Sequence, residues 1–321
     1  MTMKKDVHMT GRDLMGMVQL RPQDIGEIAI VPGPRERLDA VVKKLENPVK
    51  NFSFMEYTMF TGDYQGTRVT AINGGRFSAD TAITTEILCN AQAKAMVRIG
   101  SCGALREDIR IGDFVVARTA LRGEGVTPYY VDKDFVPQAD SALTERLLQA
   151  AAGAPGKVHE GTVWSTDAIL RETREHVGRA VDQGAIAVDM VSSVFLTICQ
   201  LYKIPAAVIL AVSDNVMTGE MGFLNTDYYM AESAMVGMAL GPVKGLQIIP
   251  TSTTPLETNI RLIKGVGTGI KEMLIGMTAT KGLFANTQSS MESDIAAFTK
   301  DIESMEDRKS TRLNSSHVSQ S

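Results

Sequence analysis

Short β-branched apolar runs alternate with amphipathic stretches from about residue 26 onward, and this rhythm leaves few folds open to the chain. Strands that alternate with helices are typical of α/β proteins, in which helices cover a sheet. The expected strands are 27–31, 68–72, 95–99, 114–117, 157–164, 185–188 and 206–212. The expected helices are 78–93, 141–152, 171–181 and 191–201. The pattern therefore predicts an α/β fold.

Several of these strands end in glycine or small polar residues, at 31–33, 73–75, 100–103 and 213–215. In open α/β sheets the ligand crevice lies at the carboxyl ends of the strands. The four turns therefore point to a site at one edge of the sheet.

The overall composition limits the partners of the chain. Of 321 residues, 44% are hydrophobic and 22% charged, and the net charge of −4 gives no field that would attract nucleic acid or an anionic membrane. The longest strongly apolar stretch, 205–212, is far shorter than the roughly 20 residues that span a bilayer, and no apolar run follows the N-terminal lysines. Three widely spaced cysteines suggest neither disulfides nor a metal site. We expect a soluble cytoplasmic protein without a metal.

Two arginines follow the first expected strand, in the run Val31-Pro-Gly33-Pro-Arg-Glu-Arg37. Free backbone N–H groups at the start of a helix, with a guanidinium close by, form an anion site. The same run also fits a simple turn with solvated arginines. The motif alone leaves both interpretations open.

Arg98 lies inside an otherwise apolar expected strand. An unpaired buried guanidinium would cost several kcal/mol, so Arg98 needs an anionic partner. That partner is either a phosphate group of a ligand or a carboxylate of the core. Ser101, three residues later in a glycine-rich turn, would donate its hydroxyl to the same anion.

Six segments occur in an order that identifies a family. They are Val31-Pro-Gly33 with Arg37, the Gly74-Gly75 turn, Arg98-Ile-Gly-Ser101-Cys-Gly103-Ala, Ser165-Thr-Asp167, Val188-Asp-Met190 and Val212-Ser-Asp-Asn215. The chain thereby resembles the nucleoside phosphorylase superfamily, and most closely its trimeric or hexameric purine nucleoside and uridine phosphorylases. The resemblance covers residues from about 24 to 215.

The resemblance implies a three-layer α/β/α fold with a twisted mixed sheet, and a homo-oligomer whose neighbouring subunits share active sites. It implies a single catalytic domain over 24–250, after an N-terminal segment 1–23 and before a C-terminal helical extension over 251–307. Residues 308–321 are rich in Ser and Asn with little to bury, so we expect a disordered, non-native tail. Residues 217–245, rich in Met, Gly and Ala, suit a packed helix or a mobile flap equally.

The implied activity is that of a pentosyltransferase, which transfers a pentose from a base to inorganic phosphate without a metal or organic cofactor. The residues implied to bind phosphate are Gly33, Arg37, Arg98 and Ser101, the set that includes the arginines selected above. Arg76 is not part of the family pattern, and its position just after the Gly-Gly turn makes it a candidate for an extra anion contact. The residues implied to bind the nucleoside are Cys102, Gly103, Ile169, Val188, Met190, Ser213 and Asp214. Ordinary core packing is the alternative for the apolar members of this set.

Asp214 is the expected catalytic residue beside Arg98. A proton given to a purine ring nitrogen lets the base leave as a neutral molecule, and the family's purine-acting members carry an aspartate here. The alternative is that residues 213–215 only form an Asx turn or a helix cap.

The chain departs from the family pattern where ribose is held, because Val191 replaces a glutamate and cannot accept a hydrogen bond. Met55 stands where relatives lend an arginine to the neighbouring subunit, and no arginine between residues 215 and 242 can support Asp214. The match of His8 to the histidine that relatives lend to the sugar stays open. These losses fit altered sugar hydroxyls, a differently placed carboxylate such as Asp189 or Glu220, or lost activity.

The sequence thus predicts phosphorolysis of a purine ribonucleoside to free base and ribose 1-phosphate. Uridine is not favoured, because 173–175 lacks the Gln-x-Arg that reads uracil. Two alternatives stay open. One is a hydrolytic nucleosidase, although that class usually lacks the paired arginines, and the other is a non-catalytic protein that binds nucleosides or nucleotides on the same scaffold.

Overall fold

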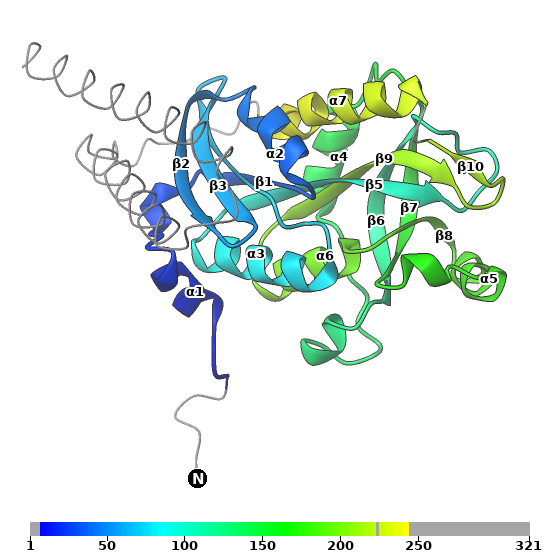
Figure 1. Cartoon of the computed structure of the whole chain (residues 1–321), viewed down its shortest axis with the longest axis horizontal. Coiled ribbons are helices and arrows are strands. Elements are labelled where there is room, and N and C mark those ends of the chain that lie inside the picture. Colours follow the sequence, from blue (N-terminus) through cyan, green and yellow to red (C-terminus); the bar gives the residue numbers. More distant parts are fainter. Residues whose placement is uncertain (1–6, 223–224, 244–321) are drawn as a thin grey trace, which may run out of the picture. The chain divides into compact units, whose positions relative to one another are not determined.

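A mixed β-sheet forms the centre of the computed structural model, which describes residues 7–222 and 225–243 (Figure 1). Its strands are β1 Ile28–Pro32, β2 Glu46–Phe54, β3 Tyr57–Tyr64, β4 Thr67–Ile72, β5 Ala95–Ala104, β6 Phe114–Gly123, β7 Val158–Thr166, β8 Ala185–Asp189, β9 Ala206–Asn215 and β10 Glu220–Met221. The spatial order is β10-β9-β6-β7-β8-β5-β1-β4-β3-β2. The expected regions 251–307 and 308–321 lie outside the described residues.

Strand directions are mixed, as expected. The pairs β1–β4, β1–β5, β5–β9, β6–β7 and β7–β8 are parallel, whereas β2–β3, β3–β4, β5–β8 and β6–β9 are antiparallel. Because β9 pairs with both β5 and β6, the strands β5, β9, β6, β7 and β8 close into a ring. This ring joins the ends of β5, β8 and β9 at one place in the fold.

Helices cover both faces of the sheet (Figure 1). The helices are α1 Gly11–Met17, α2 Arg35–Val42, α3 Ser78–Asn90, α4 Ser141–Ala150, α5 Arg174–Asp182, α6 Ser192–Leu201 and α7 Thr226–Leu240. One apolar core joins α1, α3 and α6 to the sheet, and a second joins α2, α4 and α7 to its other face. The expected three-layer α/β/α fold is therefore confirmed.

Short one-turn helices connect some of these elements, and a side-chain cap fixes the start of the last long helix. The short helices are η1 Pro22–Asp24, η2 Thr127–Tyr129, η3 Ile169–Arg171 and η4 Gly241–Val243. The α7 helix begins after Asn225, whose side chain accepts a hydrogen bond from the N–H of Asp227 at 2.9 Å and so caps the first turn. The stretch that suited a helix or a flap is thus a packed helix over 226–240.

The sequence pattern misplaced two features of the sheet. The strands β2 and β3 were not expected. In β2, most side chains are exposed and polar and give no apolar run. The expected turn at 100–103 is wrong, since β5 continues to Ala104 and pairs there with both β8 and β9. The turn expected at 213–215 is likewise the end of β9. The strand extensions arise because ring closure gives these polar and glycine residues backbone partners that local sequence does not reveal.

Within residues 7–222 and 225–243, no helix combines the length and the apolar character needed to cross a membrane.

Candidate functional site

Glycine turns bring the expected phosphate residues together at the carboxyl ends of parallel strands. Gly33 follows β1, and the Gly74-Gly75 turn follows β4. The N–H of Gly74 donates to the carbonyl of Gly33 at 3.3 Å, and the N–H of Gly75 donates to that of Pro32 at 3.2 Å. Gly74 has φ +128, and a Cβ there would press on the Thr84 methyl group, so the turn requires glycine. The two turns are therefore joined by backbone hydrogen bonds into one unit.

Arg37 is buried on α2, with only 5% of its surface exposed. Its Nε and Nη2 donate to Oε1 of Glu232 on α7 at 3.0 and 2.5 Å. Its Nη1 lies 3.7 Å from where a Cβ of Gly33 would be. The interpretation of this motif as a turn with solvated arginines is therefore wrong for Arg37.

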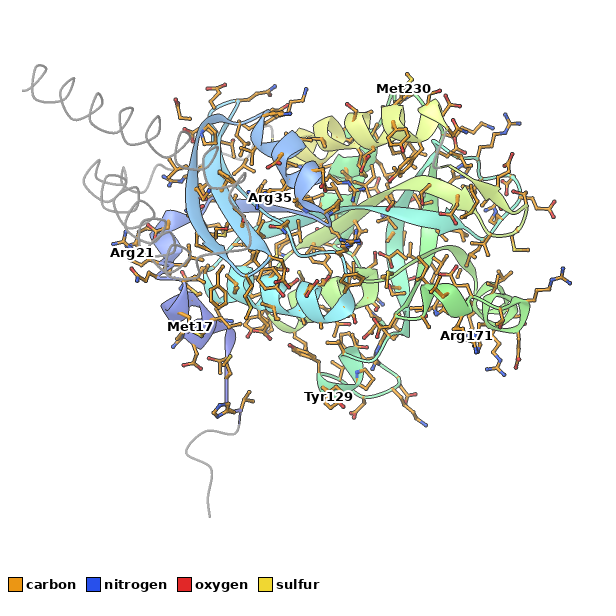
Figure 2. The ribbon with its side chains drawn as sticks, viewed as in Figure 1. Met17, Arg21, Arg35, Tyr129, Arg171 and Met230 are labelled. Carbon is orange, nitrogen blue, oxygen red and sulfur yellow. The ribbon has the colours of Figure 1, made fainter. Side chains whose placement is uncertain are left out.

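The first arginine of the motif has a different environment. Arg35 (labelled in Figure 2) donates from Nη1 to the hydroxyl of Thr58 on β3 at 2.8 Å, and it also pairs with Asp39 at 3.5 Å. About half of each side chain in that ion pair is exposed. Only Arg37 joins the buried group around Gly33.

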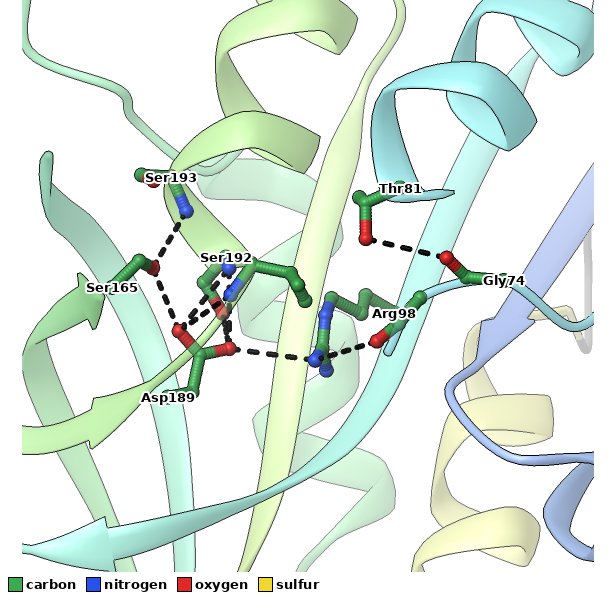
Figure 3. A network of polar contacts seen from close by, with 9 residues as sticks. Gly74, Thr81, Arg98, Ser165, Asp189, Ser192 and Ser193 are labelled. Carbon is green, nitrogen blue, oxygen red and sulfur yellow. Dashed lines mark hydrogen bonds and ion pairs between the residues drawn. The ribbon is translucent and has the colours of Figure 1, made fainter. Parts of the chain in front are cut away.

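Arg98 lies in the middle of β5 and is also buried. Its Nη2 donates to the carbonyl of Gly75 at 3.1 Å and lies 3.4 Å from Oδ2 of Asp189 (Figure 3). A Cβ at position 100 would overlap Nη1 of Arg98, so Gly100 lets the guanidinium lie against the strand. The core carboxylate considered as a partner for Arg98 therefore exists, and it is Asp189.

Asp189 does not satisfy the whole guanidinium of Arg98. Within the described part of the chain, Nε and Nη1 of Arg98 are buried and have no hydrogen-bond partner. Burial lowers the pKa of Arg98, the nearby Asp189 carboxylate opposes that shift, and the positive charge of Arg37 adds to it. Two buried donors without acceptors, next to a second arginine, form a site that suits an anion.

A network of hydrogen bonds fixes Asp189, as Figure 3 shows. Its carboxylate accepts from the hydroxyls of Ser165 and Ser192, each at 2.7 Å, and from the backbone N–H groups of Val191 and Ser192 at 3.1 to 3.2 Å. The side chain is 1% exposed. Because Asp189 is sealed and fully used, it is not the differently placed carboxylate that would replace the missing sugar contact.

The same network continues to a buried glutamate. Ser193 donates its N–H to the hydroxyl of Ser165 at 3.0 Å and its own hydroxyl to Oε1 of Glu124 at 3.0 Å. Glu124 also accepts from the N–H groups of Val126 and Thr127 at 2.7 and 2.9 Å. The loop at 124–127 is thus tied, through side chains at the start of α6, to the carboxylate beside Arg98.

The third residue of the Ser165-Thr-Asp167 segment connects the start of α3 to the loop at Gly125. Oδ1 of Asp167 accepts from the hydroxyl of Ser78 at the start of α3 at 2.5 Å, and Oδ2 accepts from the N–H of Gly125 at 2.8 Å. The segment therefore contributes Ser165 to the network around Asp189, and Asp167 to the contact between α3 and the loop at Gly125. Neither residue was assigned a role from the sequence.

Asp214, Gly103, Val188 and Val216 form a second group, called here the Asp214 cluster. A Cβ at Gly103 would lie 2.8 Å from Oδ2 of Asp214, 3.0 Å from Cγ2 of Val216 and 3.2 Å from Cγ1 of Val188. The hydroxyl of Ser213 donates to Oδ1 of Asp214 at 2.7 Å. The cluster therefore packs a carboxylate and apolar side chains closely around a glycine, where a larger residue would collide with them.

The expected alternative for residues 213–215, a simple Asx turn, applies to Asn215 and not to Asp214. Oδ1 of Asn215 accepts from the N–H groups of Met217 and Thr218 at 2.9 and 3.0 Å. The Asp214 side chain takes no part in that turn. Its carboxylate is half-buried beside Gly103.

Cys102 lies between the two groups. It is buried in β5, and its backbone carbonyl accepts from the hydroxyl of Ser213 at 3.2 Å. Burial raises the pKa of its thiol well above the usual value, and the charges of Asp189 and Asp214 raise it further. The thiol is therefore neutral.

The other expected residues have varied environments. Ile169 is 57% exposed in η3, so its side chain does not form a buried wall within this chain. Val191 is fully buried and precedes α6, where its side chain packs into the core. Glu220 is exposed on β10, opposite Asn215. Met190 is half-buried directly after β8, and His8 is exposed near the N-terminus. Arg76 is exposed and lies over the ring of Phe77 at 5.2 Å.

Sequence reasoning missed Glu232, Tyr228 and Glu172. Glu232 and Tyr228 lie four residues apart on α7, a helix whose Met- and Ala-rich sequence gave no sign of a polar role. Glu172 follows η3 and precedes α5. Its burial and the nearby charge of Asp214 raise its pKa from 4.5 to about 7. Glu172 fell inside the expected helix 171–181, where a carboxylate gave no sign of a special role.

The shifted pKa of Glu172 leads to a prediction about stability. Between pH 4.5 and about 7 the folded protein holds a proton that the unfolded chain has lost, so stability falls as pH rises through this range. We expect Glu172→Gln to melt a few degrees higher than the wild type at pH 8, because the variant gains about 1 kcal/mol in free energy of unfolding once screening by solvent is allowed for. Near pH 5 the difference should disappear. Thermal unfolding followed by circular dichroism at both pH values tests this, and an equal gain at both would contradict it.

Comparisons with known proteins give the chain a family. Residues 27–239 match the family model of the phosphorylase superfamily. A DeoD-type purine nucleoside phosphorylase from Jannaschia sp. (strain CCS1) is 32% identical over 202 residues, which cover 62% of this chain and 86% of the relative. A guanosine phosphorylase from Halorubrum lacusprofundi is 30% identical over 213 residues, which cover 66% of this chain and 88% of the relative.

Solved structures share the fold. The uridine phosphorylase of Vibrio fischeri ES114 is 24% identical with a TM-score of 0.64, over 70% of this chain and 95% of that one. The purine nucleoside phosphorylase of Toxoplasma gondii in complex with immucillin-H is 22% identical with a TM-score of 0.66, over 77% of this chain and 98% of that one. Because the family model matches residues 27–239, which is well over half of the chain, this chain belongs to the phosphorylase superfamily.

Proposed function

We propose that this protein is a nucleoside phosphorylase, a pentosyltransferase that converts a purine ribonucleoside and inorganic phosphate into a free base and ribose 1-phosphate. The observation that carries the proposal is the buried guanidinium of Arg98, with two unpartnered donors, beside a second buried arginine at a glycine turn. Relatives at 30 and 32% identity that are named guanosine and purine nucleoside phosphorylase support it.

In the proposed reaction, Gly33, Arg37, Arg98 and Ser101 hold phosphate, and its oxygen forms a bond to the anomeric carbon of the sugar. The bond between that carbon and the base nitrogen breaks, and its electron pair goes to the base. The phosphate anion stabilises the positive charge that develops on the sugar, while the arginines keep phosphate in place. The protein supplies position and charge, and the co-substrate supplies the nucleophile.

The base is proposed to lie at the Asp214 cluster. Val188 and the buried Cys102 supply apolar walls for a flat ring, and Gly103, which has no side chain, lies directly beside the Asp214 carboxylate. Asp214 then gives a proton to a purine ring nitrogen, or hydrogen-bonds to it, as the base leaves. This role supports purines over uridine as substrates.

The test is the dependence of turnover on phosphate. Purified full-length protein is incubated with inosine, adenosine, guanosine or uridine, each with and without phosphate, and free base and ribose 1-phosphate are measured. We expect both products from the purine nucleosides, and only when phosphate is present. Base release without phosphate would instead indicate a nucleosidase. Nucleoside binding without release under either condition would indicate a binding protein.

A further inference from the structure

The two buried arginines of the proposed phosphate site are held by different parts of the fold. Arg98 is fixed by Asp189 at the end of β8 and by the carbonyl of Gly75. Arg37 is instead fixed by Glu232 on α7, 195 residues away in the sequence. The α7 helix packs on β5 and β9 and also contacts α2, which carries Arg37. The geometry of one arginine thus depends on a helix outside the turns that form the site.

Glu232 takes up one edge of the Arg37 guanidinium. A single oxygen, Oε1, accepts from both Nε and Nη2, while Nη1 is left directed toward the turn at Gly33. The Arg37 side chain is 5% exposed and that of Glu232 is 28% exposed. A long side chain held by two charge-assisted bonds on one edge has few orientations left for its other edge.

Tyr228 lies one helical turn before Glu232, on the same face of α7. Its phenol lies close to Ser101 and to Arg37, near enough for both residues to lower its pKa. Burial and the charge of Glu232 raise the pKa of Tyr228, while the nearby Arg37 and Ser101 oppose the rise, so the phenol is neutral at neutral pH. One face of α7 therefore contacts two residues of the proposed phosphate site.

We propose that Glu232 and Tyr228 are positioning residues that aim Arg37 and Ser101 at phosphate, an inference that rests on the proposed function. The opposing interpretation is that Glu232 competes with phosphate for Arg37. The contacts favour positioning, because Glu232 accepts from Nε and Nη2 and does not take up Nη1, which lies on the side of Gly33. The two interpretations predict opposite changes in phosphate affinity when the carboxylate is removed.

The experiment measures the KM for phosphate and kcat at saturating phosphate, and also binding of inorganic phosphate by calorimetry. We expect Glu232→Ala to weaken phosphate binding and raise its KM about tenfold, with kcat changed less than about threefold. Glu232→Gln keeps an oxygen that accepts from the same edge, so its loss should be smaller. Tyr228→Phe should raise the KM about threefold, and Tyr229→Phe, its more exposed neighbour, serves as the matched control that keeps the wild-type KM.

A double-mutant cycle separates positioning from a merely structural effect. If Glu232 acts through Arg37, then Glu232→Ala should have no further effect on phosphate KM in an Arg37→Ala background. Additive losses, or tighter phosphate binding by Glu232→Ala, would overturn the proposal. If the wild type shows no turnover but the variants bind phosphate more weakly than it does, positioning is supported and the phosphorylase assignment is overturned. A wild type that does not bind phosphate would overturn both.

Discussion

Arg98→Ala is expected to lower kcat/KM for phosphate-dependent cleavage about a thousandfold. The wild-type guanidinium offers two buried, unpartnered donors and a positive charge where phosphate is proposed to bind, and alanine offers neither. The reaction should fall toward the rate without phosphate. Initial rates over a range of phosphate concentrations, with base release as the signal, measure the change.

This variant also breaks a buried ion pair, so its fold needs a control. Asp189 keeps its hydrogen bonds from Ser165 and Ser192, and we expect a loss of about 3 kcal/mol rather than collapse. Circular dichroism and thermal melting report that loss. Arg98→Lys keeps the charge near Asp189 but not the planar fork, and it should recover part of the stability and little of the activity. Full activity in a folded Arg98→Ala protein would exclude the proposed phosphate site.

Asp214→Asn is expected to slow purine nucleoside cleavage by a factor of about one hundred to ten thousand, the range of general acid catalysis. An amide can still donate a hydrogen bond, but it has no carboxyl proton to give to the departing base. The side chain is half-buried and makes its hydrogen bond with Ser213, so the fold should tolerate the change. The measurement is kcat with inosine or guanosine at saturating phosphate.

A substrate that needs no proton provides the control for Asp214. In 7-methylguanosine the ring nitrogen already carries a methyl group, so the base leaves in neutral form without an acid. Asp214→Asn should cleave this nucleoside at close to the wild-type rate. Equal losses with both nucleosides would assign Asp214 to binding or structure, and no loss with either would remove it from the mechanism.

The arrangement of charge in the site follows from the burial of its arginines. Arg37 and Arg98 each have one carboxylate partner, Glu232 and Asp189, so the four groups are neutral as a set. Such pairing lets two guanidinium groups lie close together in the core. The unpartnered donors on Arg98 are what remains to bind an anion.

Sequence reasoning succeeded where a local pattern carried the information. Arg98 stood out because a charge interrupted an apolar strand, and the structure confirms its burial and shows that one of the two expected anionic partners, a core carboxylate, lies beside it. The order of strands and helices followed from periodicity in the same way. Local reasoning failed at residues 100–103, where glycine was taken as a turn although ring closure supplies strand partners on both sides. It also gave no reason to expect β2 and β3, because β2, whose sequence is largely polar, is held as a strand by its pairing with β3, which in turn pairs with β4.

The sequence by itself determined the α/β alternation, the family, and which glycines and arginines stand at the strand ends, because these are properties of neighbouring residues. Only the tertiary structure decided which carboxylate faces each arginine, that Asp189 is sealed below the site, and that Val191 packs into the core. It also decided that α7 reaches Arg37 across 195 residues of sequence. Such contacts depend on how strands and helices pack in space, and side chains far apart in the sequence carry no local signal of that packing.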